Sequence, residues 1–191
     1  MDIFDLIKTR RSVREFEKKP IPREVMETIV QAGIWAPSSM NGQPWRFVVV
    51  SDPTELKSVA HEAKIELSNY LKTPEAEVKY GKENCARFMP RAEGEDELFY
   101  GASAIVFVIS TNLENNHFDH GLASQNMMLC AHGLGIGSCP IGLAEPLNQS
   151  KKVKKLFGLK PSERIVIALV FGYPAEKPHA TERNFEVVKW I

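Results

Sequence analysis

The chain carries an uninterrupted apolar run near its middle, Ala104-Ile105-Val106-Phe107-Val108-Ile109. β-Branched and aromatic side chains are typical of strands, and a run without polar residues predicts a strand that is covered on both faces. A second run of this kind extends from Arg164 to Phe171, and a shorter one from Arg46 to Val50. We therefore expect a buried sheet at the centre of the fold.

Helical patterns surround these strands. Asp2 and Asp52 belong to the residue types that cap helix N-termini, while Pro22 and Pro53 suit the first helical turn. The longest pattern stops at glycines, which commonly terminate helices, and Asp119 near its start is expected to cap it. Helices are accordingly expected over residues 2–9, from Pro22 to near Pro37, over about 54–70, over about 119–133 and from Lys151 to Phe157.

Two segments have a less regular pattern. Residues 72–98 are polar and contain Pro74 and Pro90. They are expected to form a mobile excursion with some helix, because long loops in compact domains are often lids or binding loops. An irregular stretch rich in Pro, His and Thr precedes the last expected strand, Phe185 to Trp190.

The order of these elements favours the α+β class, because helices and strands do not alternate as strictly as in a doubly wound parallel sheet. The glycines of Gly133-Leu134-Gly135-Ile136-Gly137 follow a helix. They therefore do not match the dinucleotide fingerprint, which lies between a strand and a helix. The chain of 191 residues has no internal repeat or low-complexity linker, so one domain spanning 1–191 is expected.

Composition narrows the functional classes. Lys plus Arg and Asp plus Glu both number 24, and this balance argues against a nucleic-acid or anionic-membrane surface. Cys85, Cys130 and Cys139 are too few and too widely spaced for a disulfide framework, and the histidines form no metal-ligand pair. No apolar run approaches the roughly 18 residues of a membrane span, and no secretory pattern opens the sequence. We expect a cytoplasmic protein without a metal centre.

A cluster of cations follows the first expected helix. Arg10, Arg11, Ser12 and Arg14 lie within five residues. Such a cluster can be solvated charge that the C-terminal end of the helix dipole tolerates. It can also converge on a multiply charged anion, because guanidinium groups bind phosphate through paired N–H donors and a serine hydroxyl adds another. The sequence leaves both interpretations open.

The second cluster is a polar turn, Ala36-Pro37-Ser38-Ser39-Met40-Asn41-Gly42-Gln43-Pro44-Trp45, which leads directly into a strand. Proline, serine, asparagine and glycine favour turns. The segment can be a simple helix-to-strand connection. It is, however, long and rich in hydrogen-bonding groups, which is what the edge of a planar heterocycle requires.

Together the two clusters resemble the nitroreductase family of FMN enzymes, in which R-R-S-V-R-x-F is followed by A-P-S-S-x-N-x-Q-P-W and a V-V-V strand. Ser124 to Cys139 resembles that family's central helix and glycine-rich turn. Val166 to Pro174 resembles its penultimate strand, and Arg183 to Val188 its closing segment. The resemblance covers the chain except for about 72–98, and it rests on four motifs in the family's order.

This resemblance implies a role for each matching residue. Arg10 and Ser12 match residues that hold the ribityl phosphate of FMN, with Arg11 between them, and Arg183 completes that phosphate site. Arg14 matches a basic residue near the pyrimidine edge of the flavin, where reduction leaves negative charge. The loop that reaches the same flavin from the other subunit is matched by Pro37, Ser38, Ser39 and Asn41. The backbone groups that contact flavin N5 are matched by Ile141, Gly142 and Leu143.

Gly142 is the first candidate for the N5 contact, although family members often carry an acidic residue at that place. The implied fold is a central, mostly antiparallel sheet flanked by helices, in an intertwined homodimer with C-terminal strand exchange. FMN would accept electrons from NAD(P)H and pass them to a nitroaromatic, a quinone or a similar small acceptor by a ping-pong mechanism. No catalytic side chain is needed, because the flavin carries the chemistry.

The acceptor itself is not encoded in these motifs. Residues 72–98 are expected to shape its pocket, with Phe88, Met89 and Arg91 as candidates. Two alternatives remain open. One is a different flavin chemistry on the same scaffold, such as enone reduction or reaction with oxygen. The other is a non-catalytic flavin-binding module.

Overall fold

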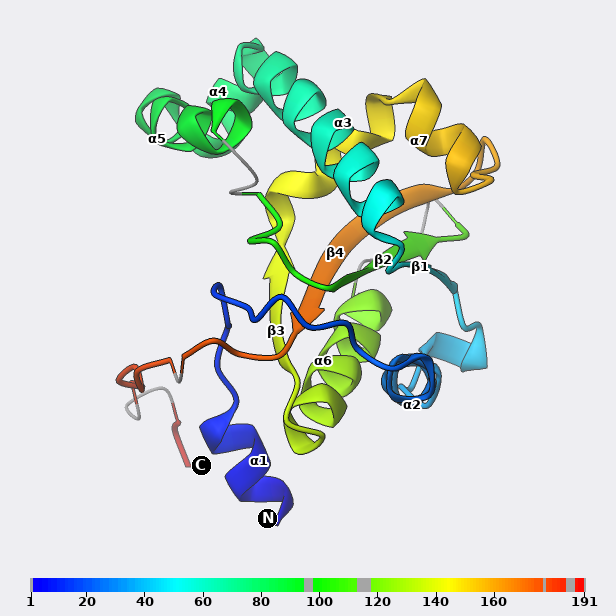
Figure 1. The fold of residues 1–191 in the computed structure, drawn as a ribbon, viewed down its shortest axis with the longest axis vertical. Helices are drawn as coiled ribbons and strands as arrows, with labels where there is room; N and C mark the ends of the chain where they lie inside the picture. The colour runs from blue at the N-terminus through cyan, green and yellow to red at the C-terminus, as the bar shows by residue number, and fades with distance from the viewer. Residues whose placement is uncertain (1, 95–97, 113–117, 177, 185–187, 191) are drawn as a thin grey trace.

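The computed structural model describes residues 2–94, 98–112, 118–176, 178–184 and 188–190. Figure 1 shows a sheet lying between two groups of helices. Within the described residues the sheet has the order β1-β2-β4-β3, and every neighbouring pair is antiparallel. Its strands are β1 (Trp45–Val50), β2 (Ala104–Ser110), β3 (Gly137–Ile141) and β4 (Arg164–Gly172). The expected α+β class and the antiparallel sheet are confirmed.

The helices expected from the sequence are present, with ends shifted by a few residues. Asp2 and Asp52 cap their helices as expected, since the Asp2 side chain accepts from the Asp5 N–H and the Asp52 side chain from the Thr54 and Glu55 N–H groups. The helices are α1 (Ile3–Thr9), α2 (Arg23–Ile34), α3 (Pro53–Leu71), α4 (Pro74–Tyr80), α5 (Lys82–Glu93), α6 (Phe118–Gly133) and α7 (Lys151–Leu156). Among the described residues, two 3₁₀ segments, η1 (Ser39–Asn41) and η2 (Gly142–Gln149), complete the regular structure.

The two layers of helices explain the apolar run at 104–109. Successive side chains of a strand point to opposite faces of a sheet. Ile105, Phe107 and Ile109 of β2 pack in the core cluster formed with α3, α4, α5, η2 and α7. Ala104, Val106 and Val108 pack in the cluster formed with α2 and α6. Every residue of β2 is therefore buried.

Three segments differ from the expectations. β3 was not predicted, and residues 72–98 contain more regular structure than expected, because Thr73 caps α4 and Gly81 then allows α5 to begin with a φ of 81°. Residues 188–190 form no strand in this chain, while the remainder of the expected closing strand, 185–187, lies outside the described residues.

Candidate functional site

The arginine cluster begins where α1 ends. Arg10 is the C-cap of α1, and its backbone N–H donates to the carbonyl of Leu6. The Arg11 guanidinium donates to the carbonyl oxygens of Lys8 and Arg10. The Arg11 guanidinium therefore stabilises the C-terminal end of α1, where the helix dipole favours a positive charge. Arg10 leaves the helix with an extended backbone, which turns the following residues toward the sheet.

Close backbone contacts hold this segment against β3. The Val13 N–H donates to the Ser138 carbonyl at 3.0 Å, and Ser12 forms an isolated parallel bridge with Ser138. Gly137 makes the approach possible, because a Cβ there would lie 2.7 Å from Cγ2 of Val13. Arg10, Ser12 and Arg14 are thus carried on a strand-like segment of fixed position rather than on a free loop.

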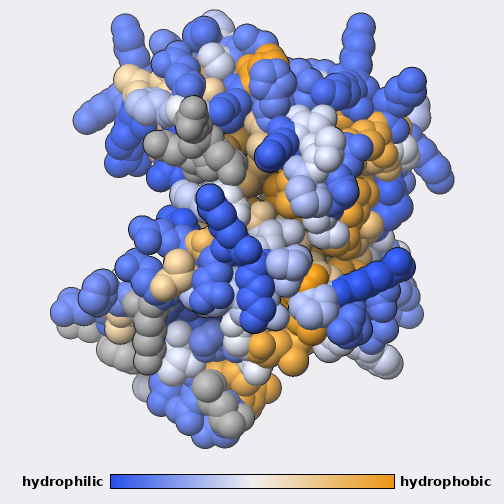
Figure 2. Space-filling view, viewed as in Figure 1, coloured by the Kyte–Doolittle hydropathy of each residue, from blue (hydrophilic) through white to orange (hydrophobic). Residues whose placement is uncertain are grey.

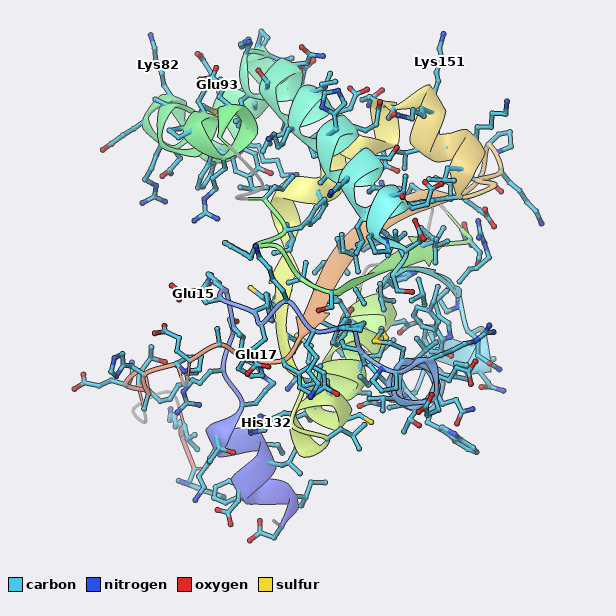
Figure 3. All side chains as sticks on the ribbon, in the orientation of Figure 1. Glu15, Glu17, Lys82, Glu93, His132 and Lys151 are labelled. Atoms are coloured by element: carbon cyan, nitrogen blue, oxygen red, sulfur yellow. The ribbon has the colours of Figure 1, made fainter. Side chains whose placement is uncertain are left out.

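A hollow of about 480 Å³ forms between this segment and the part of the chain after β4. It is lined by Arg10, Arg11, Ser12, Val13, Arg14, Glu15, Glu176, Pro178, His179, Thr181 and Arg183. A second hollow of about 700 Å³ shares part of this lining and extends to His132 and Ser138. Figure 3 places His132 at the end of α6 beside α1, and Glu15 further along the N-terminal segment.

The electrostatics of the hollow favour an anion. Burial, above all, lowers the pKa of Arg10, and the positive charges of Arg11 and Arg183 act in the same direction. Arginine stays charged in proteins, so this direction means that the crowded guanidinium is costly until an anion neutralises it. Arg10 Nη1, Arg11 Nε and Ser138 Oγ are buried and lack a hydrogen-bond partner among the described residues.

These unpartnered donors indicate which kind of ligand fits the site. A buried polar atom without a partner costs free energy, and native structures rarely leave one unpaired. Arg10 and Arg11 line both hollows, and Ser138 lines the second. Their unpartnered atoms, together with several guanidinium groups, match a ligand that offers several anionic oxygens. A phosphate group has this chemistry. Of the site residues predicted from sequence, the structure brings together Arg10, Arg11, Ser12, Arg14 and Arg183.

The polar turn lies elsewhere. The Ser39 N–H donates to the Asp119 carboxylate at the start of α6, at 3.3 Å, whereas Thr9 contacts His132 at the end of α6, at 2.9 Å. A helix rises 1.5 Å per residue, so these two points are roughly 20 Å apart. Figure 1 likewise shows η1 beside α2, away from α1. Residues Pro37, Ser38, Ser39 and Asn41 therefore do not meet the arginines within one chain.

The turn nevertheless has a defined shape. Ser38 Oγ accepts a hydrogen bond from the Gln43 N–H at 3.0 Å. Met40, Asn41 and Gln43 all have positive φ angles, of 53°, 54° and 43°. Residues other than glycine adopt this region rarely, and such strain clusters at functional sites. Asp119 lies within the first turn of α6, so the expectation that it caps this helix is wrong; it fixes the turn instead.

The predicted N5-contact residues lie at the end of β3. Ile141 is buried, Gly142 is exposed at the start of η2, and Leu143 packs against the core. None of them lines the two hollows described above. The sequence analysis did not identify Thr181, which lines the first hollow, or Ser138, which lines the second. Each is a single hydroxyl residue without a motif around it.

Other classes of site find no support in the part of the chain that the structure describes. No group of three or more His, Cys, Asp or Glu side chains there is arranged to hold a metal ion. Among the same residues, no helix is both long and apolar enough to cross a bilayer.

The fold places an antiparallel sheet between two helical layers, and a cationic hollow forms where the N-terminal segment meets β3. These features are those of an α+β protein that binds an anionic ligand. The sequence model of the nitroreductase family matches residues 7–173. The chain belongs to the nitroreductase family.

Individual proteins agree with this assignment. A Methanothermobacter thermautotrophicus protein named "Putative NADH dehydrogenase/NAD(P)H nitroreductase" is 30% identical, over 93% of this chain and 80% of that protein. A Pseudomonas putida protein named "4-nitrobenzoate reductase" is 29% identical, over 92% and 87% of the two chains. The crystal structure of a Bacteroides fragilis nitroreductase with bound FMN superposes with a TM-score of 0.83, at 24% identity, covering 100% of this chain and 99% of that one. The predicted nitroreductase fold is confirmed.

Proposed function

We propose that this chain is an FMN-dependent oxidoreductase that takes electrons from NAD(P)H and passes them to a small acceptor, such as a nitroaromatic or a quinone, by a ping-pong mechanism. The observation that carries the proposal is the arginine-lined hollow with its unpartnered buried donors, Arg10 Nη1 and Arg11 Nε. The family to which the chain belongs and the names of its relatives give the ligand its identity.

The cationic hollow suits the phosphate of FMN. A phosphate monoester carries a charge of about −1.5 to −2 at neutral pH, which would offset the mutual repulsion of Arg10, Arg11 and Arg183. Ser12 supplies a hydroxyl donor on the same segment. The Bacteroides fragilis protein, whose fold this chain shares, holds FMN in its crystal structure.

Arg14 extends the cationic row beyond the phosphate-binding residues. In the proposed complex it lies near the pyrimidine edge of the flavin, where a fixed charge stabilises the reduced ring. Backbone N–H groups of Gly142 and its neighbours Ile141 and Leu143 are the proposed donors to N5. When bound, FMN supplies the hydride and electron-transfer chemistry. The protein supplies position, charge and hydrogen bonds, and no side chain acts as acid or base.

A homodimer completes the proposed site. Pro37, Ser38, Ser39 and Asn41 lie at the opposite end of α6 from Arg10, so they can reach the same ligand only from a second copy of the chain. α1 exposes Ile3, Phe4 and Ile7, and the polar turn exposes Met40 almost completely, at 98%. Exposed apolar patches of this kind mark protein interfaces.

Strand exchange is the proposed form of this interface. β1 is an edge strand of the sheet, and an open edge is a template for another strand. Val188 and Trp190 in the C-terminal segment are exposed and do not pair within the chain. We propose that this segment adds to β1 of the partner subunit, in a cytoplasmic dimer whose chains each form one domain.

Purified protein tests the proposal directly. We expect yellow protein with one FMN per chain, reduced by NADH or NADPH without oxygen and reoxidised by a nitroaromatic or quinone. Double-reciprocal plots of the initial rate against NAD(P)H concentration that stay parallel at several acceptor concentrations would support the ping-pong order. Colourless protein that does not bind added FMN contradicts the proposal. Yellow protein that neither nicotinamide reduces would instead support the non-catalytic flavin-binding module.

A further inference from the structure

The second hollow reaches a histidine that the proposed phosphate site does not yet include. In Figure 2 the lower part of the molecule, where α1 and the chain ends lie, carries mainly hydrophilic side chains. Arg10 and Arg11 line both hollows, and His132 lines the second. His132 belongs to the last turn of α6, and Figure 3 shows it beside α1. The His132 imidazole therefore lies in the same hollow as two of the proposed phosphate-binding guanidinium groups.

The second hollow also contains a buried hydroxyl that a ligand can satisfy. Ser138 lines this hollow and is only 2% exposed, and its Oγ has no hydrogen-bond partner among the described residues. Arg10 Nη1 and Arg11 Nε share this property. Leaving such atoms unpaired is costly, so an anionic ligand is expected to contact them. The negative charge that the two arginines hold is then presented to the second hollow as well as to the first.

Thr9 fixes the orientation of the His132 ring. The Thr9 hydroxyl donates its hydrogen to the Asp5 carbonyl at 2.6 Å, and its oxygen lies 2.9 Å from His132 Nε2. A hydroxyl has one hydrogen, so the Thr9 oxygen accepts from the imidazole and Nε2 carries the hydrogen. A second proton therefore binds at Nδ1 and leaves the contact with Thr9 intact. The ring can keep its place in both the neutral and the charged form.

The charges around His132 favour its neutral form until an anion binds. Burial, above all, lowers the pKa of His132, and the charges of Arg10 and Arg11 act in the same direction. A phosphate held by these two arginines would reverse their effect, since a nearby negative charge favours the protonated imidazole. Other ionisable groups on the neighbouring elements are Lys8 and Asp5, which pair with each other on α1, and Glu176 and His179 after β4. Phosphate binding and protonation of His132 should therefore reinforce each other.

We propose that His132, held by Thr9, is a further residue of the phosphate site, which takes up a proton from solvent as the FMN phosphate binds and so adds a positive charge to the site. The inference rests on the proposed function and adds a binding residue that no sequence motif indicated. It also makes the affinity for FMN depend on pH. The gain from His132 appears as the pH falls through the pKa of His132 in the complex and is complete below its pKa in the free protein.

The test compares the FMN affinity of the full-length wild type, His132→Gln and His132→Lys as the pH is varied. Glutamine is neutral at every pH used, whereas lysine carries a fixed positive charge. The ratio of dissociation constants, His132→Gln over wild type, should rise from about 1 near pH 8.5 to about 3–10 near pH 5.5, as expected for charges roughly 10 Å apart at a protein surface. His132→Lys should bind FMN about as tightly as the wild type near pH 5.5 and more tightly near pH 8.5.

Taking a ratio removes the competing titrations. The phosphate of FMN itself titrates near pH 6, which changes the affinity of every variant alike, and Glu176 and His179 are present in all of them. Riboflavin, which lacks the phosphate, should give a His132→Gln ratio that does not change with pH. His61→Gln is the matched control, because it removes an exposed histidine from α3, which packs in the other core cluster from α6. Its ratio to the wild type should stay near 1 throughout.

Calorimetry measures the proton directly. Titration of FMN into the FMN-depleted chain, in two buffers of different ionisation enthalpy, gives the number of protons taken up on binding. Near pH 6.5 the wild type should take up roughly 0.3 proton or more beyond the uptake of His132→Gln. This readout does not depend on turnover. His132→Lys should show the same deficit, which keeps the inference testable if His132→Gln does not fold.

Three outcomes overturn the inference while the proposed function stands. One is an affinity ratio for His132→Gln that is the same at every pH, which indicates that the residue is only structural. Another is a ratio that changes with pH for riboflavin as it does for FMN. The third is equal proton uptake by the wild type and the His132 variants. A wild type that does not bind FMN at any pH overturns the proposed function, and the inference with it.

Discussion

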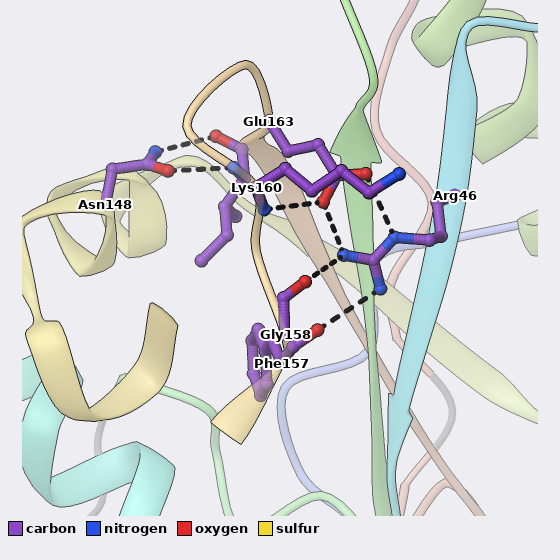
Figure 4. Close-up of polar contacts among 7 residues, drawn as sticks. Arg46, Asn148, Phe157, Gly158, Lys160 and Glu163 are labelled. Atoms are coloured by element: carbon purple, nitrogen blue, oxygen red, sulfur yellow. Dashed lines mark hydrogen bonds and ion pairs between the residues drawn. The ribbon is translucent and has the colours of Figure 1, made fainter. Parts of the chain in front are cut away.

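Arg46 and Glu163 form a two-point ion pair across the sheet, with Arg46 Nη2 2.7 Å from Glu163 Oε2 and Arg46 Nε 3.4 Å from Oε1 (Figure 4). The same guanidinium donates to the carbonyl oxygens of Phe157 and Gly158. The Glu163 side chain is only 5% exposed and also accepts from the Lys160 N–H at 3.0 Å. The pair fastens β1 to the turn that leads from α7 into β4.

Glu163→Gln should destabilise the fold by about 2 kcal/mol, because a neutral amide replaces the charge and turns one acceptor into a donor facing Arg46. This corresponds to roughly 4 to 8 °C in Tm for a chain of this size. Glu27→Gln is the control, since it breaks the exposed Arg23–Glu27 pair, which is expected to contribute less than about 0.5 kcal/mol. Thermal unfolding followed by circular dichroism makes the comparison. Equal Tm values for the two variants would contradict the role given to the pair.

The same carboxylate makes the stability of the folded chain depend on pH. The hydrogen bond from Arg46 is the main cause that lowers the pKa of Glu163, and a hydrogen bond from Ser150 is the main cause that lowers the pKa of Glu62. A carboxyl whose pKa is lower in the folded state binds fewer protons there than in the unfolded state. Its stabilisation is complete above the ordinary value of about 4.3 and is lost as the pH falls through the folded value.

Urea unfolding from pH 7 to pH 3 checks this expectation. The free energy of unfolding should fall below about pH 4.5, and the fall should be shallower in Glu163→Gln, which cannot titrate at that position. A parallel decline in the wild type and the variant would show that other carboxyl groups dominate the acid limb.

Much of the sheet could be predicted from sequence, because β1, β2 and β4 are runs of β-branched residues that only a buried strand accommodates. β3 could not, because Gly137, Ser138 and Pro140 have poor strand propensity. β3 is an edge strand, which tolerates proline, and Gly137 is required there by its contact with Val13. The local sequence pattern therefore did not predict β3, because a tertiary contact with Val13 determines the residue at position 137.

The candidate site divides in the same way. The cations between Arg10 and Arg14 stand out because they are adjacent in sequence, and the resemblance alone linked them to Arg183. No local pattern could show that the Arg11 guanidinium would donate to the Lys8 carbonyl at the end of α1, or that Ser138 would be buried beside Ser12. These placements depend on how the N-terminal segment crosses β3, which the sequence does not encode locally.

Arg10→Ala should weaken FMN binding by about 10- to 100-fold, the loss expected when a charge-assisted hydrogen-bonding group is removed. Arg23→Ala, which removes an exposed arginine from α2, is the control and should bind FMN normally. Titration of the apoprotein by flavin fluorescence gives both values. Riboflavin, which lacks the phosphate, should bind the wild type and Arg10→Ala with similar affinity. Unchanged FMN affinity in Arg10→Ala would remove the phosphate assignment.

Gly137→Ala should displace the segment that carries Arg10 and Ser12. The new Cβ would lie 2.7 Å from Cγ2 and 2.9 Å from Cβ of Val13, and overpacking of this kind costs about 1–3 kcal/mol. Both Tm and FMN affinity should fall. Adding Val13→Ala removes the nearest methyl groups and should restore part of the loss. Gly121→Ala is the control, because a Cβ at that position would meet nothing outside its own helix backbone within 4 Å and alanine favours the helix interior. A similar loss of Tm and FMN affinity in Gly121→Ala would argue against the steric explanation.

The separation of Asn41 from Arg10 predicts a complementation result in hybrid dimers. Asn41→Gly removes the amide and keeps the left-handed backbone, since Asn41 has a φ of 54° and glycine tolerates that conformation. Homodimers of Arg10→Ala and of Asn41→Gly should each bind FMN weakly. A hybrid of one chain of each kind, purified with two different affinity tags, should hold one FMN tightly, because a site shared between chains then has one intact copy and one doubly defective copy. If the turn served its own chain, both sites of the hybrid would carry one defect and no tight site would form. Counting tightly bound FMN per hybrid dimer therefore decides whether the turn acts across the interface.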